Sequence, residues 1–360
     1  DALTTGGNNV AIGRNALSLE DAGSFNTAIG MNALVAQDAG DAYNVAIGYN
    51  AGATISTGSI NVIIGGLAGD ALTTGSNNIA IGYAALSAED AHGGNVAIGR
   101  GALAIQDAGA DAHNVAIGRS VGGSMSTGVR NILIGSYAGD AITTGAYNVA
   151  IGYDALGTED TGQSNTAIGY EALKVADFNG HAYNTALGLQ AGIAVSTGVH
   201  NTLIGAKAGD AITSGENNMV IGYNAAASAV DVDNEITLGD ANIDAFRCAD
   251  QSIAALSDGR DKSNVEESPY GLEFINKLKP VKFTWDFRPE NMAENKQGKS
   301  RVGFIAQDLQ EAMPNNDNDI LDLVYEINEN RLEAKYGNLI PIMAKAIQEL
   351  SEEIKELKKK

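Results

Sequence analysis

Ser257 and Lys262 are two residues of this 360-residue chain whose types and spacing suit covalent chemistry. A serine hydroxyl is a weak nucleophile until a base removes its proton, and a lysine whose pKa is lowered by burial can be that base. Both lie in the stretch SDGRDK, five positions apart. The pattern predicts a Ser-Lys pair, with Ser257 as nucleophile and Lys262 as base. The alternative is that Ser257 caps a helix and Lys262 is a solvated charge.

Other reactive residue types give weaker signals. Asp258 and Arg260 lie within the same stretch, where we expect them to position the loop or to pair with each other. Cys248 is the single cysteine, so it predicts no intrachain disulfide framework. The four histidines lack metal-ligand spacing and are interpreted as surface or turn residues: His92, His113, His181 and His200. The sequence therefore predicts no cofactor and no metal site.

Residues 1–250, which precede this stretch, are built from a short repeat. The block Asn-x-(Ala/Ile/Leu/Val)-(Ile/Leu)-Gly recurs with closing glycines mostly 17 residues apart. Counting from Gly13 to Gly239 gives fourteen copies, of which the last, NEITLG at 234–239, is weaker. Apolar residues alternate within each block, which is typical of a β-strand. The repeat predicts a parallel β-solenoid with one rung per unit. Each closing glycine suits a corner with positive φ or close backbone approach, and the asparagines are expected to form a hydrogen-bonded row.

A longer period lies over the short one. TTGSNNIAIGY at 73–83 returns at 143–153 and 213–223 in closely similar form, so four rungs make one 70-residue super-repeat. Acidic clusters follow nearly the same period: LEDAG at 19–23, AEDAH at 88–92 and TEDTG at 158–162. We interpret these acids as a solvated face on which like charges are kept apart. A divalent-cation site is the alternative, although no calcium-loop spacing is present.

Charge and composition restrict the partners. The net charge is −21, and residues 1–256 contain 24 acidic and 7 basic side chains, against 20 and 16 in 257–360. Nucleic acid and anionic membrane surfaces would be repelled by the first region. No apolar run reaches membrane-spanning length, so no membrane insertion is expected. The chain opens on DALTTGGNNV, within the repeat and without a signal peptide, and we expect it to be a fragment of a longer protein.

Beyond residue 250 the pattern becomes that of a small mixed α+β domain. Residues 280–287 and 322–328 alternate as strands do. Residues 303–314 place Ile305, Leu309 and Met313 on one helical face. We therefore expect two domains, a repeat shaft at 1–250 and a globular unit at 251–360.

The chain ends in a helix with heptad spacing, from about residue 339. Its apolar residues follow a 3-4-3-4-3 pattern: Ile340, Met343, Ile347, Leu350, Ile354 and Leu357. This seam predicts a coiled coil and hence an oligomer. Isoleucine at the first position of the pattern with leucine or methionine at the second favours two strands when taken alone.

Four blocks of residues 251–360 carry a resemblance to a known family. SDGRDK (257–262), LEFINKLKPVKFTW (272–285), GFIAQDLQEAMP (303–314) and YGNLIPIMAKAIQELSEEI (336–354) occur in this order. The region resembles the C-terminal intramolecular chaperone of endosialidase tailspikes and other phage tail fibres. The resemblance implies a homotrimer, assembly of the preceding β-structured fibre by this domain, and self-cleavage before the serine of Ser-Asp.

Carried over to this chain, the resemblance places the cut between Leu256 and Ser257. Ser257 could attack the carbonyl carbon of Leu256, giving an ester that water then hydrolyses. The implied enzyme is a single-turnover self-cleaving serine peptidase with no external substrate.

The repeats also resemble the head repeats of trimeric autotransporter adhesins, which carry a similar Asn-x-Val-Ala-Ile-Gly run. We therefore expect a phage tail fibre or tailspike segment that is part of the virion and is assembled in the host cytoplasm. Its expected partners are two further copies of the chain and a host cell-surface glycan or protein receptor. A bacterial trimeric surface adhesin is the alternative. A polysaccharide-degrading spike is a third reading that lacks paired carboxylates at a fixed site.

Overall fold

A computed structural model describes residues 4–247, 257–286, 296–314, 317–328 and 331–359. The chain divides into two compact units, Asp1–Asp240 and Ala241–Lys360. The boundary expected at 250/251, the lone Cys248 and the expected cleavage residue Leu256 fall outside the described residues. Within the described part, no helix is both long and apolar enough to cross a bilayer.

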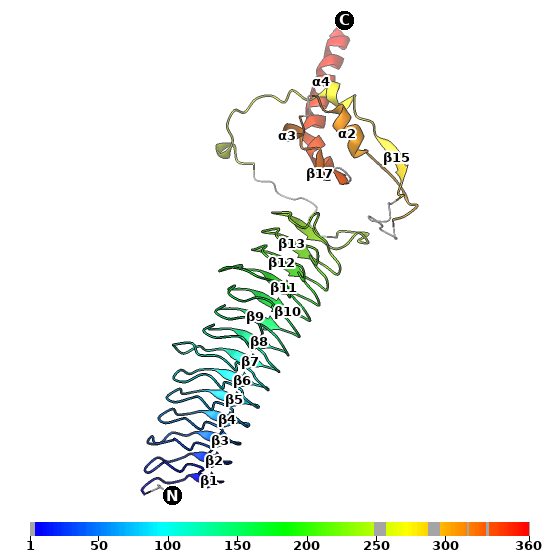
Figure 1. The fold of residues 1–360 in the computed structure, drawn as a ribbon. Helices are drawn as coiled ribbons and strands as arrows, with labels where there is room; N and C mark the ends of the chain where they lie inside the picture. The colour runs from blue at the N-terminus through cyan, green and yellow to red at the C-terminus, as the bar shows by residue number, and fades with distance from the viewer. Residues whose placement is uncertain (1–3, 248–256, 287–295, 315–316, 329–330, 360) are drawn as a thin grey trace. The chain divides into compact units, whose positions relative to one another are not determined.

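The first unit is a parallel β-solenoid, as the repeat predicts. Its strands form a single sheet in sequence order, and each pairs in register with the next, for example Val10 with Thr27 and Ile12 with Ile29 (Figure 1). The fourteen three-residue strands are β1 Val10–Ile12, β2 Thr27–Ile29, β3 Val45–Ile47, β4 Val62–Ile64, β5 Ile79–Ile81, β6 Val96–Ile98, β7 Val115–Ile117, β8 Ile132–Ile134, β9 Val149–Ile151, β10 Thr166–Ile168, β11 Thr185–Leu187, β12 Thr202–Ile204, β13 Met219–Ile221 and β14 Ile236–Leu238.

The strands point their middle residue into the solenoid and their two flanking residues outward. From β2 to β13 the middle residue is buried in every strand, and in most of them it is alanine. The middle position holds alanine in eight of these twelve strands and the larger residues Ile63, Leu133, Leu203 and Val220 in the other four. Leucines at other points of the rung, such as Leu34 and Leu86, also fill the interior. The bulkier Val, Ile and Thr side chains therefore line the outer face of the sheet.

The asparagine before each strand from β1 to β13 forms a continuous row, which is buried from Asn26 to Asn218. The side-chain carbonyl of Asn114 accepts a hydrogen bond from the backbone N–H of Asn131, at 2.8 Å, and Asn131 does the same for Asn148. The amide of Asn131 donates to the carbonyl of Gly145, at 2.9 Å. The predicted row is therefore present, but it runs mainly from side chain to backbone. Such bonds satisfy backbone groups that burial would otherwise leave unpaired.

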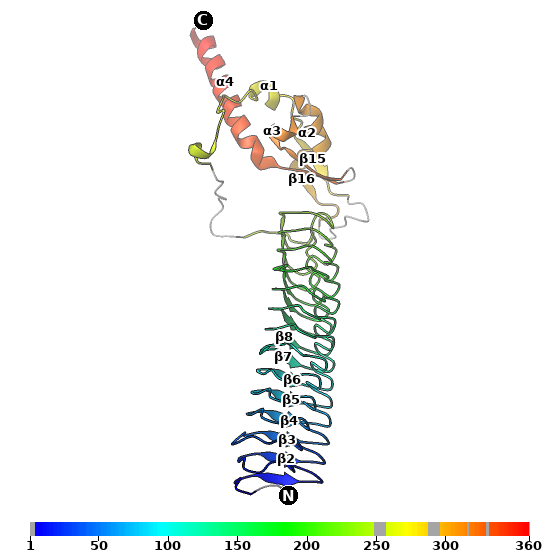
Figure 2. The same ribbon diagram turned by 60° about the vertical axis from the view of Figure 1, so that its left-hand side comes forward.

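The closing glycines from Gly13 to Gly222 meet both conditions expected of them. Gly13 has φ +129°, and a Cβ there would lie 2.6 Å from the carbonyl oxygen of Gly30 in the next rung. Any larger residue would push neighbouring rungs apart. Figure 2 shows the rungs stacked closely along the coil.

One interior corner explains the four-rung super-repeat. The residue six to eight positions before each asparagine of the row is buried in twelve successive rungs. These residues are Glu20, Gln37, Ile55, Leu72, Glu89, Gln106, Met125, Ile142, Glu159, Ala176, Val195 and Ile212. A glutamate thus enters the core once in every four rungs. The reading of the acidic clusters as a solvated face is wrong for these glutamates, because the corner turns them inward.

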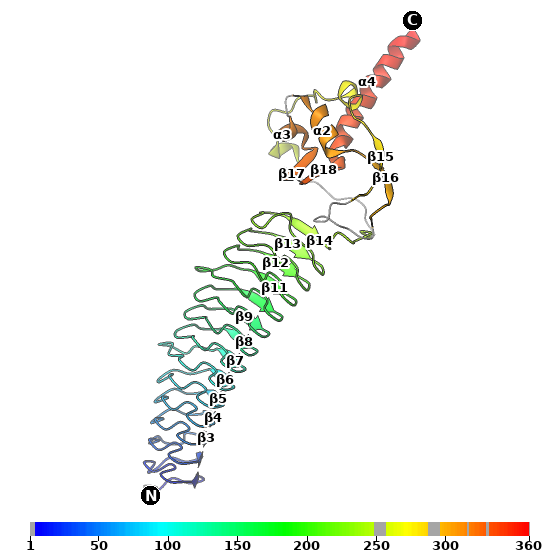
Figure 3. The same ribbon diagram turned by 45° about the vertical axis from the view of Figure 1, so that its right-hand side comes forward.

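The second unit contains short helices and two hairpin-like strand pairs (Figure 3). Strand β15 (Val281–Thr284) pairs antiparallel with β16 (Ser300–Gly303), and β17 (Val324–Asn328) pairs with β18 (Arg331–Ala334). Among the described residues, the helices are α1 (Leu272–Ile275), α2 (Ala306–Ala312), α3 (Asn318–Leu321) and the longer α4 (Leu339–Lys359). The same residues form the 3-10 turns η1 (Gly259–Asp261) and η4 (Tyr336–Asn338).

The core of this unit joins α1, α2, α3, β17 and the start of α4. Phe274, Leu309, Met313, Leu323 and Ile342 are among its buried residues. Leu309 and Met313 lie on the face that the sequence predicts to be apolar. The helix itself begins later than expected, at residue 306, because residues up to 303 extend the strand paired with β15.

Helix α4 has two apolar faces with different surroundings. Leu339, Ile342 and Ala346 are buried against the rest of the unit. All six residues of the predicted heptad seam are exposed, including Ile340 at 67%, Ile347 at 65% and Leu357 at 68%. The seam is therefore a separate apolar stripe that the described residues of this chain leave uncovered.

Candidate active site

The structure brings Ser257 and Lys262 into hydrogen-bonding contact. The amine nitrogen of Lys262 donates to the hydroxyl oxygen of Ser257 at 2.6 Å. Between them lies η1, a single 3-10 turn whose end is marked by the backbone N–H of Lys262 bonding to the carbonyl of Gly259. The turn reverses the chain direction, so that the side chains of Ser257 and Lys262, five residues apart, come into contact. Spacing alone therefore positions the nucleophile candidate against its candidate base.

Asp258 and Arg260 pair with each other inside the same turn. The Asp258 carboxylate accepts from the Arg260 backbone N–H at 2.9 Å and from the guanidinium at 2.5 to 3.1 Å. Asp258 is thus the N-cap of η1. The hydrogen bond from the Arg260 side chain, followed by that from its backbone N–H, lowers the pKa of Asp258. The Asp258–Arg260 pair stabilises the first half of the turn, and Ser257 and Lys262 hydrogen-bond to each other.

All residues from 257 to 262 are exposed in this single chain. A lysine acts as a base only when it has lost its proton, and burial favours that neutral form. The described residues therefore provide the contact between hydroxyl and amine, but not the desolvation that proton transfer requires. Leu256, whose carbonyl would be attacked, lies outside the described residues.

The segment after the turn is fastened to α4 by contacts that the sequence analysis did not identify. The Lys345 amine lies 2.9 Å from a carboxylate oxygen of Glu267, and the Glu349 carboxylate accepts from the backbone N–H of Leu272 at 2.7 Å. Glu349 thus caps the start of α1. These contacts link residues 77 or 78 positions apart, so no local pattern could reveal them.

A second long-range contact closes the domain core. The Tyr270 hydroxyl hydrogen-bonds to the Asp317 carboxylate, and this bond is the main cause that raises the pKa of Tyr270. Tyr270 also packs edge-on against Phe274. The chain that leaves the candidate site is therefore held at Glu267, Tyr270 and Leu272, close in sequence to the site.

Comparison with known proteins agrees with the resemblance seen in the sequence. Residues 257–318 match the family described as the chaperone of endosialidase, and the match begins at Ser257. The chain is also similar to the long tail fiber protein Gp37 of Enterobacteria phage M1 and to that of Enterobacteria phage Ox2. Each comparison gives 37% identity over 103 residues, which is 28% of this chain and 38% of the relative.

The chain therefore spans well under half the length of these curated relatives. No solved structure matches the chain.

Proposed function

We propose that this protein is a segment of a phage tail fibre or tailspike whose solenoid forms the shaft and whose residues 251–360 act as an intramolecular chaperone. The observation that carries the proposal is the match of residues 257–318 to the chaperone of endosialidase, joined in one chain to a repetitive solenoid. The similarity to two phage long tail fiber proteins supports it. On this view the protein is part of the virion, is assembled in the host cytoplasm and binds a host cell-surface glycan or protein.

The active assembly in this proposal is a parallel homotrimer. The exposed heptad seam of α4 supports association, because six apolar residues on one stripe would otherwise stay in water. An adjoining face of α4 is already used within its own chain, so the helix can join a bundle without leaving its domain.

The outer face of the solenoid sheet supports the same arrangement. Its two outward positions in each of the fourteen strands hold Val, Ile, Leu, Met or Thr and no charged residue. In a region with 24 acidic and 7 basic side chains, an uncharged stripe of this length is suited to contact with other copies. Three chains with parallel stripes would bury it along the whole shaft.

Self-cleavage before Ser257 is the second part of the proposal. The Ser257–Lys262 contact supports it, with Asp258 and Arg260 shaping the turn. Because the site is exposed in one chain, we place the missing desolvation in the trimer, where neighbouring chains would cover the turn. Cleavage would then follow assembly, and an unassembled chain would keep its chaperone.

The experiment that tests this function combines two measurements on the full chain. Multi-angle light scattering gives the number of chains, and intact mass spectrometry reports whether a fragment of residues 257–360 is released. A trimer that accumulates this fragment agrees with the proposal. A stable monomer, or a cut at another position, would contradict it.

A further inference from the structure

The acidic corners of the solenoid contain two groups of side chains arranged as metal ligands do. Potential ligand atoms of Glu20, Asp21 and Asp38 all lie within 4.8 Å of one another. Those of Glu89, Asp90, His92 and Asp107 do the same. Calcium is bound at about 2.4 Å from each oxygen, so two ligands of one ion are at most about 4.8 Å apart. Each group is therefore compact enough to surround a single ion.

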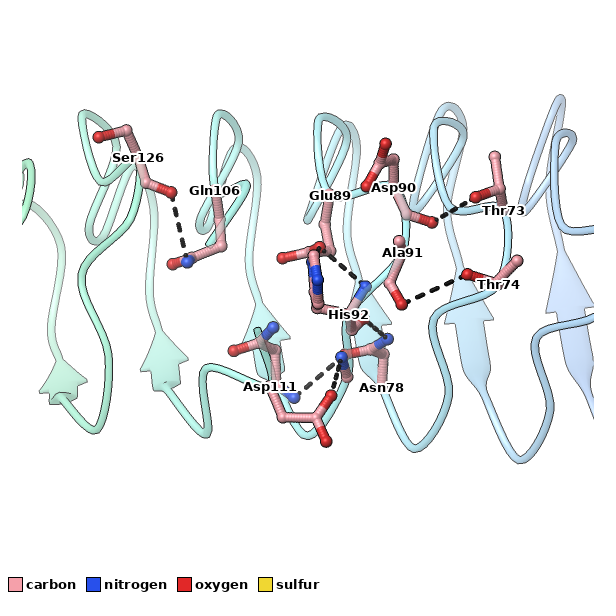
Figure 4. A network of polar contacts seen from close by, with 12 residues as sticks. Thr73, Thr74, Asn78, Glu89, Asp90, Ala91, His92, Gln106, Asp111 and Ser126 are labelled. Carbon is pink, nitrogen blue, oxygen red and sulfur yellow. Dashed lines mark hydrogen bonds and ion pairs between the residues drawn. The ribbon is translucent and has the colours of Figure 1, made fainter. Parts of the chain in front are cut away.

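The two groups are copies of one arrangement. Glu20 and Glu89 occupy the same interior corner, one super-repeat apart, and Asp38 and Asp107 follow each of them by 18 residues, in the next rung. Each site thus combines one buried glutamate with exposed aspartates from two successive rungs. Figure 4 shows Glu89, Asp90 and His92 at one turn of the solenoid, with Gln106 entering from the next rung.

The glutamates themselves point to a missing partner. Glu20 and Glu89 are fully buried, and within the part of the chain that the structure describes the Oε2 atom of each has no hydrogen-bond partner. Their Oε1 atoms accept backbone N–H groups, from Gly23 at 2.5 Å and from His92 at 3.1 Å. A buried carboxylate oxygen without a partner is costly, and a bound cation or a proton would balance it. The aspartates beside each glutamate favour the cation.

The glutamines in the next rung show what a satisfied side chain looks like at this corner. Gln37 and Gln106 accept hydrogen bonds from the amides of Asn44 and Asn114, at 2.7 and 3.0 Å. Glu20 and Glu89 make no such bond, and among the described residues the amide nitrogens of Asn26 and Asn95, which follow them in their own rungs, also lack a partner. The glutamines therefore bond to the asparagine row, whereas the carboxylates of Glu20 and Glu89 lie within 4.8 Å of the neighbouring aspartate oxygens.

The third copy of the corner provides an internal contrast. Glu159 accepts from the backbone N–H of Gly162 at 2.6 Å and also from that of Phe178 at 3.3 and 3.4 Å. Both of its oxygens have a partner, so the carboxylate of this copy has no unsatisfied atom to offer. The amide nitrogen of Asn165 lacks a partner among the described residues, as those of Asn26 and Asn95 do, so the contrast lies in the glutamate alone. Asp177 stands where Asp38 and Asp107 stand in the other copies.

We propose that the corners at Glu20 and Glu89 each bind one divalent cation of the calcium class, held by the buried glutamate and the aspartates of two adjoining rungs. The first site offers only oxygen ligands, which hard cations prefer. The second adds Nδ1 of His92, 3.3 Å from Oε1 of Glu89, and accepts Mn²⁺ as well. A bound divalent ion offsets two of the three negative charges at the corner and joins two rungs. This role explains why acids that repel one another recur at the same corner.

Calcium binding to the full-length protein tests the proposal. The protein is stripped with chelator, dialysed against buffer containing Ca²⁺ and analysed by elemental mass spectrometry, with isothermal titration calorimetry for affinity. We expect two ions per chain and a thermal unfolding midpoint that rises with Ca²⁺. Asp38→Asn and Asp107→Asn are each expected to remove one ion, and the double variant both. These aspartates are exposed, so the variants are expected to fold.

Asp177→Asn is the matched control, because it changes the same position at the corner where Glu159 is already satisfied. It is expected to retain two ions. The proposal is overturned if the stripped protein binds no Ca²⁺ or Mn²⁺, or if Asp177→Asn lowers the stoichiometry as much as Asp38→Asn. It is also overturned if lowering the pH raises the thermal unfolding midpoint while added Ca²⁺ or Mn²⁺ leaves that midpoint unchanged.

Discussion

The amine nitrogen of Lys262 lies 2.6 Å from the hydroxyl oxygen of Ser257, and only one 3-10 turn separates the two residues. The turn brings the two residues near each other within six consecutive residues, and their side chains make the contact. The peptide bond before Ser257 is adjacent to the same hydroxyl. We therefore expect nucleophile and base candidate to be in contact in each chain, with the trimer supplying the desolvation that activates them.

The first prediction concerns this pair. Ser257→Ala removes the proposed nucleophile, and Lys262→Arg keeps a positive charge on a group that stays protonated in proteins. Both variants are expected to form full-length trimer, with cleavage slowed by at least about 100-fold. Intact mass spectrometry over time measures the fragment. Lys277→Arg, an exposed lysine paired with Glu273, is the control and should be cut normally.

Release of residues 257–360 from the Ser257→Ala variant would rule out this hydroxyl as the nucleophile. Asp258→Asn is a milder change, because it weakens the cap of η1 and the pairing with Arg260 without touching Ser257 or Lys262. It is expected to slow cleavage severalfold and not to abolish it.

The second prediction concerns the exposed seam of α4. Ile347→Asp places a charge in the middle of the apolar stripe, and the side chain is 65% exposed in the single chain. The domain itself should therefore fold, while association is lost because a charge would be buried between helices. Light scattering is expected to give monomers or irregular aggregates. Lys355→Asp introduces the same residue outside the seam, and a trimer is expected to persist there.

How far the sequence predicts this structure depends on whether a feature repeats. The solenoid, its register and the asparagine row follow from a 17-residue pattern, and Gly13 behaves as its position in that pattern suggests. The inward direction of Glu20 does not follow, because LEDAG has the composition of a surface loop. It becomes visible only when Glu20, Gln37 and Ile55 are aligned as one corner of successive rungs.

The candidate site divides in the same way. A five-residue spacing is local information, and it was sufficient to pair Ser257 with Lys262. The anchors of the following segment, Glu349 to Leu272 and Tyr270 to Asp317, join distant parts of the chain. Such contacts depend on the packing of the folded domain, which the sequence pattern does not specify.

The third prediction uses Glu159 as a pH-dependent element of the core. Burial raises the pKa of Glu159 to about 7, and this effect outweighs the backbone hydrogen bonds from Gly162 and Phe178, which lower the pKa. The folded protein then keeps a proton that the unfolded chain releases near pH 4.5, so this group makes stability fall as pH rises from about 4.5 through about 7. Glu159→Gln should remove that slope and raise the free energy of unfolding above pH 7, by up to roughly 3 kcal/mol.

Urea unfolding at pH 4.5 and pH 8, both with chelator, measures this effect. Glutamine is a suitable replacement because Gln37 and Gln106 occupy the same corner in other rungs of the solenoid. Glu216→Gln removes the same charge from an exposed side chain and separates the effect of net charge from that of burial. The prediction would be contradicted if the difference in free energy of unfolding between Glu159→Gln and the original protein were the same at pH 4.5 and at pH 8.

The fourth prediction concerns the need for a chaperone. Fourteen similar rungs pair almost equally well in several registers, because the same apolar residues return every 17 positions. Three chains that associate through such stripes would often pair in the wrong register along the shaft. The C-terminal unit is not repetitive, so contacts through α4 can set the stagger once, after which neighbouring rungs stack in turn.

Residues 1–250 produced alone are therefore expected to give aggregates or mixed oligomers, whereas the full chain gives a soluble trimer. Once formed, the shaft should resist heat and detergent without the chaperone, because unfolding must disrupt many cooperative rungs and is slow. Electrophoresis of the two proteins with and without boiling makes the comparison, and controlled removal of residues 257–360 from the assembled trimer tests persistence. If residues 1–250 formed the same resistant trimer in similar yield, register would be encoded in the shaft itself and the chaperone role would be wrong.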